Sequence, residues 1–243
     1  MSSSRRTSIR TRSDSRSRFL AAALAVCISV SGCGGPASAP EYENPLLDPL
    51  PAFALIGRGN SSEQRQQIAE LNRKQDWEGL LGLADEQQRR DPENSDWGVI
   101  AGYARLRQRD YAKALAALSR VTQRNPEDVS AWNLLGESQR LSGQPGRAAQ
   151  TLQYASTIGP SSFVTFFFLG EAHRDAGQLD RAIPAYREAV RLEPAFALGW
   201  FELGSAQARI GDRRDAAASL EQLQRLDPRL AADLKGRIQA GRK

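Results

Sequence analysis

This 243-residue chain has one histidine and two cysteines, and its 28 acidic residues show no catalytic or metal-binding pattern. His173 is the single histidine, and we expect it to pack rather than to transfer protons. Glu171 and Asp175 lie four residues apart, a spacing that solvated helix faces commonly show. The sequence has no Ser/His/Asp set, no glycine-rich phosphate loop and no ligands at metal-binding spacing. It therefore predicts a non-enzymatic chain with no catalytic residue, metal or cofactor.

The residue best placed for covalent chemistry is Cys33, just after an apolar run near the N-terminus. This 12-residue run, Phe19–Val30, follows a segment with six arginines. It is too short to span a bilayer, which takes about 20 residues, and it has the length of a signal-peptide core. The sequence Val-Ser-Gly-Cys that ends at Cys33 resembles the lipobox of bacterial lipoproteins. The resemblance implies that residues 1–32 are a signal peptide and that Cys33 carries a lipid on its sulfur.

The alternative is an ordinary signal peptide that happens to contain a cysteine, but the position of Cys33 favours lipidation. Residues 1–32 hold six arginines and one aspartate, so their removal takes the net charge from +5 to zero. A neutral chain offers no electrostatic case for binding nucleic acid. By resemblance to enterobacterial lipoproteins, Gly34 in place of an aspartate implies sorting to the outer membrane, on its periplasmic face.

Residues 33–60 are predicted to form the lipidated N-terminus and a flexible tether. Five prolines, several small residues and few charges are typical of an extended linker. At ~3.1 Å per residue in polyproline form, the tether would reach roughly 80 Å. The apolar segment 53–56 has an alternative role, which is to pack on the first helix pair.

The rest of the chain is organised by a 34-residue repeat. A period of this length is typical of helix–turn–helix solenoids. Small residues recur in the repeat and predict close approach of the two helices, while a second set of glycines falls where the chain reverses. The repeated prolines are Pro92, Pro126, Pro160, Pro194 and Pro228. The repeated small residues are Gly102, Gly136, Gly170 and Gly204, then Ala114, Ala148, Ala182 and Ala216, and the turn glycines are Gly143, Gly177 and Gly211.

This repeat resembles the tetratricopeptide repeat (TPR) family, through W-N-L-L-G-E from Trp132, F-F-F-L-G-E from Phe166 and W-F-E-L-G-S from Trp200. The resemblance implies an all-α fold, a right-handed superhelix of antiparallel helix pairs. It covers four units, at 95–128, 129–162, 163–196 and 197–228. Residues 61–94 are interpreted as a degenerate helix pair, because Ile68 replaces the glycine. Residues 229–243, with apolar side chains every four residues, are interpreted as a capping helix.

By the same resemblance, the first helix of each unit lines a concave groove that holds a protein segment. The predicted protein-binding residues are Val99, Tyr103, Leu106, Asn133, Glu137, Arg140, Val164, Phe167, Glu171, Arg174, Leu198 and Phe201. Seven of the twelve are apolar or aromatic, which predicts an exposed apolar patch with a charged rim. Within the triple-Phe run, we expect Phe167 to face the groove, as does Phe201, and Phe166 and Phe168 to pack between units. The groove positions lack lysine, which argues against the carboxylate clamp of chaperone-binding TPR domains.

A lipid-anchored TPR superhelix is predicted to bind a protein rather than a small-molecule substrate. Chains of this size and layout resemble the assembly lipoproteins of the tight-adherence (Tad/Flp) pilus, of the TadD type, and the type IV pilus pilotins, of the PilF/PilW type. Both resemblances imply a secretin subunit as the partner, and four full repeats favour the first group. The alternative is a scaffold lipoprotein that recruits cell-wall enzymes or another envelope complex.

Overall fold

The structure is a computed structural model, and it describes residues 60–240. The predicted signal peptide, Cys33 and nearly all of the tether therefore lie outside the described residues. Between residues 60 and 240 the chain forms eleven helices and no strand, which confirms the all-α prediction. None of these eleven is both long and apolar enough to cross a bilayer.

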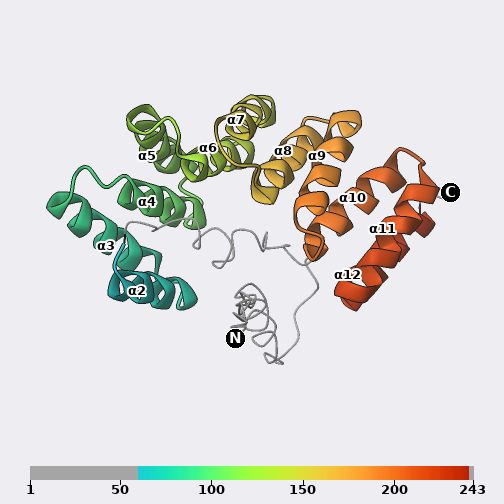
Figure 1. Cartoon of the computed structure of the whole chain (residues 1–243), viewed down its shortest axis with the longest axis horizontal. Helices are drawn as coiled ribbons and strands as arrows, with labels where there is room; N and C mark the ends of the chain where they lie inside the picture. The colour runs from blue at the N-terminus through green and yellow to red at the C-terminus, as the bar shows by residue number, and fades with distance from the viewer. Residues whose placement is uncertain (1–59, 241–243) are drawn as a thin grey trace, which may run out of the picture. The chain divides into compact units, whose positions relative to one another are not determined.

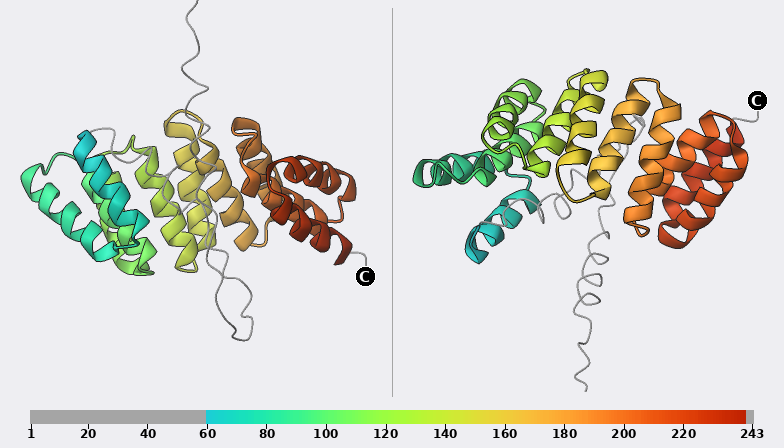
Figure 2. Two further views of the ribbon diagram at one scale, coloured as in Figure 1. Left: turned by 90° about the horizontal axis from the view of Figure 1, so that it is seen from below. Right: turned by 45° about the horizontal axis from the view of Figure 1, so that its top comes forward.

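The helices follow the predicted 34-residue step, two to a unit. They are α2 (Ser62–Arg73), α3 (Trp77–Arg90), α4 (Asp96–Arg107), α5 (Tyr111–Arg124), α6 (Val129–Leu141), α7 (Pro145–Ile158), α8 (Phe163–Asp175), α9 (Leu179–Leu192), α10 (Ala197–Arg209), α11 (Arg213–Leu226) and α12 (Pro228–Ala240). Consecutive helices pack as hairpins, and the hairpins follow one another along an arc (Figure 1). Figure 2 shows neighbouring pairs stacked side by side.

The first helices of the units lie along the inside of the arc, which we call the concave face. There α4 contacts α6, and α6 contacts α8. The second helices α5, α7, α9 and α11 lie on the outside (Figure 1). The last helix, α12, packs against both α10 and α11 and covers the end of the stack, where its Leu234 is fully buried.

Within a unit the two helices cross at the repeated glycine, as the sequence predicts. A Cβ atom on Gly102 or Gly136 would lie 2.5 Å from the Cγ atom of Leu118 or Leu152, on the second helix of the unit. The four repeated alanines on the second helices are fully buried. Both helices therefore place small residues at the crossing, and the two leucines fill the space beside the glycines.

The crossing leads to a prediction for Gly136→Ala. The added methyl group would overlap the Leu152 side chain, so we expect a loss of about 1–3 kcal/mol in the free energy of unfolding. Gly82→Ala is the matched control, because Gly82 lies inside α3 with no atom within 4 Å of an added Cβ. There the better helix propensity of alanine should stabilise by up to ~1 kcal/mol. Urea unfolding of both variants tests the contrast, and equal effects would contradict it.

Each hairpin turn has one residue with positive φ at the same place in the 34-residue step. Gly143, Gly177 and Gly211 have φ values of 82°, 73° and 83°, as the sequence predicts. The two preceding turns place Gln75 (φ 55°) and Arg109 (φ 60°) at the equivalent position. Residues with a Cβ atom are strained in this left-handed region, so the backbone of the first two turns is strained at Gln75 and Arg109.

Gln75→Gly should therefore stabilise the chain, against the usual effect of introducing glycine. Relief of the left-handed strain is expected to add about 1 kcal/mol to the free energy of unfolding. Gly143→Ala should have the opposite effect, of about the same size, since nothing but its φ opposes a Cβ there. Thermal unfolding of the two variants checks the opposite signs, and a fall in stability of Gln75→Gly would refute the strain.

Candidate functional site

The seven apolar and aromatic residues predicted to form an exposed patch on the concave face are buried. Each is at most 6% exposed. They belong to two hydrophobic clusters, with Val99, Tyr103 and Leu106 in one and Val164, Phe167, Leu198 and Phe201 in the other. The prediction of an exposed apolar patch is therefore wrong, and Phe167 and Phe201 do not face an open groove.

Neighbouring helices cover these side chains. The Tyr103 hydroxyl donates a hydrogen bond to Asn72 Oδ1 at 2.9 Å, in the preceding helix pair. The Phe167 ring meets the Phe196 ring edge-on, with the centroids 5.1 Å apart. The guanidinium of Arg237, on α12, lies over the Phe201 ring at 4.4 Å. Spacing along one helix shows which residues share a face, but contacts from the next pair decide which of them remain accessible.

The other two residues of the triple-Phe run differ from each other. Phe168 is buried, as expected. Phe166 is half-buried, and with Leu169 it lines a cavity of about 1030 Å³ between α7 and α9, on the outside of the arc. His173 lines the same cavity, and its Nδ1 atom lies 2.8 Å from Gln178 Oε1. This outer cavity was not predicted from the sequence.

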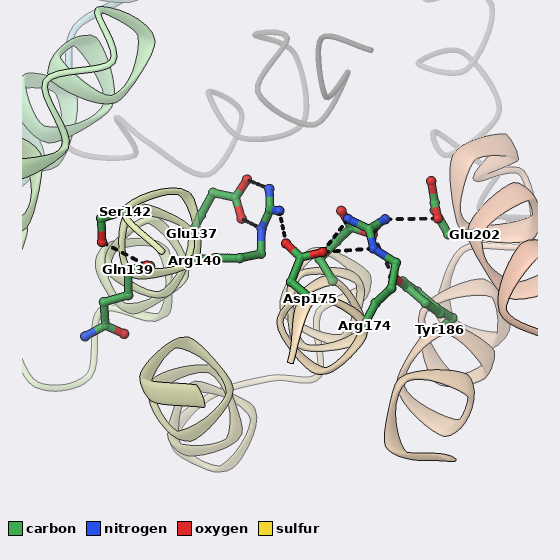
Figure 3. Close-up of polar contacts among 9 residues, drawn as sticks. Glu137, Gln139, Arg140, Ser142, Arg174, Asp175, Tyr186 and Glu202 are labelled. Carbon is green, nitrogen blue, oxygen red and sulfur yellow. Dashed lines mark hydrogen bonds and ion pairs between the residues drawn. The ribbon is translucent and has the colours of Figure 1, made fainter. Parts of the chain in front are cut away.

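The concave face carries a network of charged side chains instead of an apolar patch (Figure 3). We call it the concave polar network, and its members are Glu137, Arg140, Glu171, Arg174, Asp175, Tyr186 and Glu202. Arg140 donates from Nε and Nη2 to both carboxylate oxygens of Glu137, at 2.7 Å each. Its Nη1 atom donates to Asp175 Oδ2 at 2.5 Å, which connects α6 to α8.

Arg174 continues the network from α8 to α10. Its Nη1 atom donates to Glu171 Oε1 at 2.6 Å and to Glu202 Oε2 at 3.0 Å. Its Nε and Nη2 atoms donate to Asp175 Oδ1 at 3.0 and 2.9 Å. The Tyr186 hydroxyl, from α9, donates to Glu171 Oε1 at 2.6 Å. Charge-assisted bonds of this kind hold three consecutive units in a fixed relation.

Four of the predicted groove residues, Glu137, Arg140, Glu171 and Arg174, thus come together in the network. Three further members, Asp175, Tyr186 and Glu202, lie outside the predicted groove positions. Arg140 and Asp175 are 35 residues apart, one repeat plus one residue, so a search for opposite charges at that separation could have found them. Asn133, the remaining predicted residue, is buried, and its Oδ1 atom has no hydrogen-bond partner in the described part of the chain.

Burial sets the protonation of the central carboxyl group. It raises the pKa of Glu171 to about 7, because the charged form is desolvated; Arg174 opposes this shift and Glu202 adds to it. Burial also acts on Asp175, but Arg174 and Arg140 together hold the pKa of that carboxyl below its usual value. Two carboxyl groups that share the same arginine therefore titrate in different ranges.

The raised pKa of Glu171 predicts that the free energy of unfolding changes with pH. Its pKa is higher in the folded chain, about 7, than the usual 4.5, so between these values the folded chain binds more protons than the unfolded chain. The contribution of Glu171 to the free energy of unfolding is therefore fully present below pH 4.5, and it is lost as the pH rises through about 7. Glu171→Gln should remove that fall. Urea unfolding across the range tests it, and parallel pH profiles of the two chains would disprove the assignment.

The arrangement supports recognition of a partner. In residues 60–240, no three His, Cys, Asp or Glu side chains are grouped so that they could hold a metal ion. The charged groups of the network are paired with one another and fixed in position on the concave face. Asp175 and Arg174, at 31% and 24% exposed, are the members that the polar groups of a bound polypeptide can reach.

Three family models match the chain, and each describes the same repeat. Models described as tetratricopeptide repeat match residues 101–163 and 199–229, and one described as TPR repeat matches residues 170–211. Together they span about half of the chain. No curated protein sequence matches it.

Solved structures with the same fold include several TPR proteins. TTC0263, a thermophilic TPR protein of Thermus thermophilus, is 17% identical with a TM-score of 0.60, over 74% of this chain and 97% of its own. MamA of Desulfovibrio magneticus RS-1 is 22% identical with a TM-score of 0.58, over 68% and 94%. YrrB, described as a TPR protein with an unusual peptide-binding site, is 20% identical with a TM-score of 0.54, over 70% and 88%. With the repeat, the helix pairs and the family models in agreement, the chain is a tetratricopeptide repeat protein.

Proposed function

We propose that this chain is a lipid-anchored protein of the outer membrane, facing the periplasm, whose concave face binds a segment of another envelope protein. The observation that carries the proposal is the concave polar network, which fixes charged side chains across three repeats. Solenoids of helix pairs commonly bind polypeptides along such a surface. The peptide-binding site described for YrrB, which shares the fold, supports a polypeptide as the ligand.

The partner that we propose is a secretin subunit. The support is the layout of the chain, which resembles the assembly lipoproteins of the tight-adherence pilus. In this mechanism the lipid on Cys33 anchors the chain in the outer membrane, and residues 34–60 allow the helical repeats to extend away from it. The concave face then holds one secretin segment per chain, so that lipoprotein sorting carries the channel subunit to the outer membrane.

The membrane part of the proposal is tested by Cys33→Ser. Without the thiol no lipid can be attached, so the variant should appear in the soluble periplasmic fraction, while the unchanged chain sediments with outer membranes. Far-ultraviolet circular dichroism of both chains controls for folding. Unaltered membrane fractionation of the folded variant would exclude Cys33 as the anchor.

The binding part is tested by photo-crosslinking in cells. A photoreactive amino acid replaces Asp175, which lies at the centre of the concave face with its side chain 31% exposed. The matched control replaces Tyr154, on the outer helix α7 and 44% exposed. We expect crosslinks to a secretin subunit from position 175 and none from position 154. Crosslinks to cell-wall enzymes would support the scaffold alternative, and equal labelling from both positions would remove the concave face as the binding surface.

A further inference from the structure

A small cavity rich in arginine lies where α8, α10 and α12 meet. It measures about 240 Å³, and we call it the arginine pocket; its lining residues are Arg174, Glu202, Ser205, Ala206, Arg209 and Arg237. Pockets for drug-sized ligands commonly measure about 300–1,000 Å³. The arginine pocket therefore suits one side chain or one chain end rather than a cofactor.

The single acid of the pocket is already paired. Glu202 accepts a hydrogen bond from Arg174 at 3.0 Å and is only 13% exposed. Arg174 in turn donates from Nε, Nη1 and Nη2 to Glu171 and Asp175. The charges of these two lining residues are therefore already engaged within the concave polar network. The positive charge left in the pocket comes from Arg209 and Arg237.

Arg237 is held in place but keeps donors for a ligand. It lies over the Phe201 ring at 4.4 Å, and its Nη1 atom donates to Ser205 Oγ at 3.3 Å. A guanidinium has five N–H groups, so most of them are not used by this contact. Arg209 is exposed and makes no ion pair or side-chain hydrogen bond with any residue between 60 and 240. Two guanidinium groups and a hydroxyl thus converge on one small space.

We propose that the arginine pocket binds a carboxylate of the protein segment that the concave face holds, either an Asp or Glu side chain or the chain terminus. This inference rests on the proposed function and names the chemistry of the partner. Two planar guanidinium groups match the two oxygens of a carboxylate, and the pocket carries an excess of positive charge. Arg237 comes from the terminal helix α12, so the site differs from a clamp built from the first helices of the repeats.

The pocket also sets the direction in which a segment binds. At α6 the concave polar network pairs one acid, Glu137, with one arginine, Arg140, whereas the pocket at the α12 end is lined by three arginines and one acid. A segment with its acidic group at one end would therefore bind in one orientation. Exposed charges act through solvent, so we expect this preference to weaken as salt increases.

The proposal is tested by selecting short random peptides, with free C-termini, on the full chain. Selected peptides should share an acidic residue or the terminal carboxylate at one position. Arg209→Gln should weaken their binding by about tenfold or more, which is the loss expected for a hydrogen bond between charged groups. Arg209 is exposed, so this variant should fold normally. Arg209→Gln with Arg237→Gln should remove the acidic preference, and Arg237→Lys should retain it in part.

Arg225→Gln is the matched control, since it removes the same charge from the exposed face of α11 and should leave binding unchanged.

Peptides selected without any acidic preference would overturn the pocket assignment while leaving the proposed binding function intact. Tighter binding of inorganic phosphate than of the selected peptides would overturn it in favour of a phosphate site. Neutralising Glu41, Glu43 and Asp48 of the tether together should leave peptide binding unchanged. Stronger binding would show that these acids compete for the pocket, and would overturn the assignment to a partner segment. Failure to select any peptide would overturn both proposals.

Discussion

Phe167→Ala is expected to lower the free energy of unfolding by about 3–5 kcal/mol, the range for removing a fully buried aromatic side chain. Phe167 is 1% exposed, and its ring contacts those of Phe168, Tyr186 and Phe196 at centroid distances of 5.1 to 6.2 Å. Truncation would leave a cavity in the third unit, beside the start of α10, because packed neighbours collapse only partly into it. Urea unfolding followed by circular dichroism measures the loss.

Phe166→Ala is the matched control for this prediction. The adjacent ring is half-buried at the outer cavity, so its removal should lower the free energy of unfolding by less than half as much. A loss below about 1 kcal/mol for Phe167→Ala would instead mean that the ring lies in an accessible groove. The outcome also bears on tests of partner binding. A charged substitution at Phe167 or Phe201 would abolish capture by disrupting the core, so exposed positions such as Arg209 are the informative ones.

Arg174→Met is expected to destabilise the chain by about 3–5 kcal/mol, the range for removing one partner of a buried ion pair. Arg174 is the cation shared by Glu171, Asp175 and Glu202, and its side chain is 24% exposed. Methionine fills a similar space but leaves three carboxyl groups close together without that charge. Part of the response should be protonation of Glu171, whose pKa burial already raises to about 7.

Arg191→Met is the control, because Arg191 binds Glu188 with the same three-residue spacing and at 2.6–2.7 Å. That pair is exposed, with Arg191 at 65%, and exposed pairs contribute about 0–1 kcal/mol. Adding Glu171→Gln to Arg174→Met should recover part of the stability, because one buried carboxyl group no longer needs a cation. Urea unfolding of the single and double variants gives the coupling. Equal losses for Arg174→Met and Arg191→Met would contradict the buried network.

The fold was predictable because its signals are local and steric. Proline cannot continue a helix, and a repeated glycine marks where the side chain of a second helix must fit, as Gly136 does for Leu152. These constraints act within one 34-residue unit, so a single sequence displays them several times. The turn strain at Gln75 and Arg109 was not predicted, because glycine, its usual signal, is missing from both positions, although the 34-residue step from Gly143 leads to them.

The site was predictable only in part. Glu137, Arg140, Glu171 and Arg174 follow from their position after the repeated glycine, and they do meet on the concave face. Their partners Asp175 and Glu202 come from neighbouring helices, with side-chain directions that spacing does not specify. The arginine pocket also needs Arg237 on α12, a helix that the sequence analysis interprets only as a cap.

By itself, the sequence determined the helix pairs, their step and the capping helix, since these depend on residues close together along the chain. It also carries the only information here on Cys33 and the tether, which lie outside the described residues. The tertiary structure decided which side chains of the concave face are accessible. It buried the seven apolar and aromatic residues and brought acids and arginines of successive units within hydrogen-bonding distance. The physical reason is that exposure and ion pairing depend on atoms contributed by the next helix pair. The spacing of residues along one helix does not specify where those atoms lie.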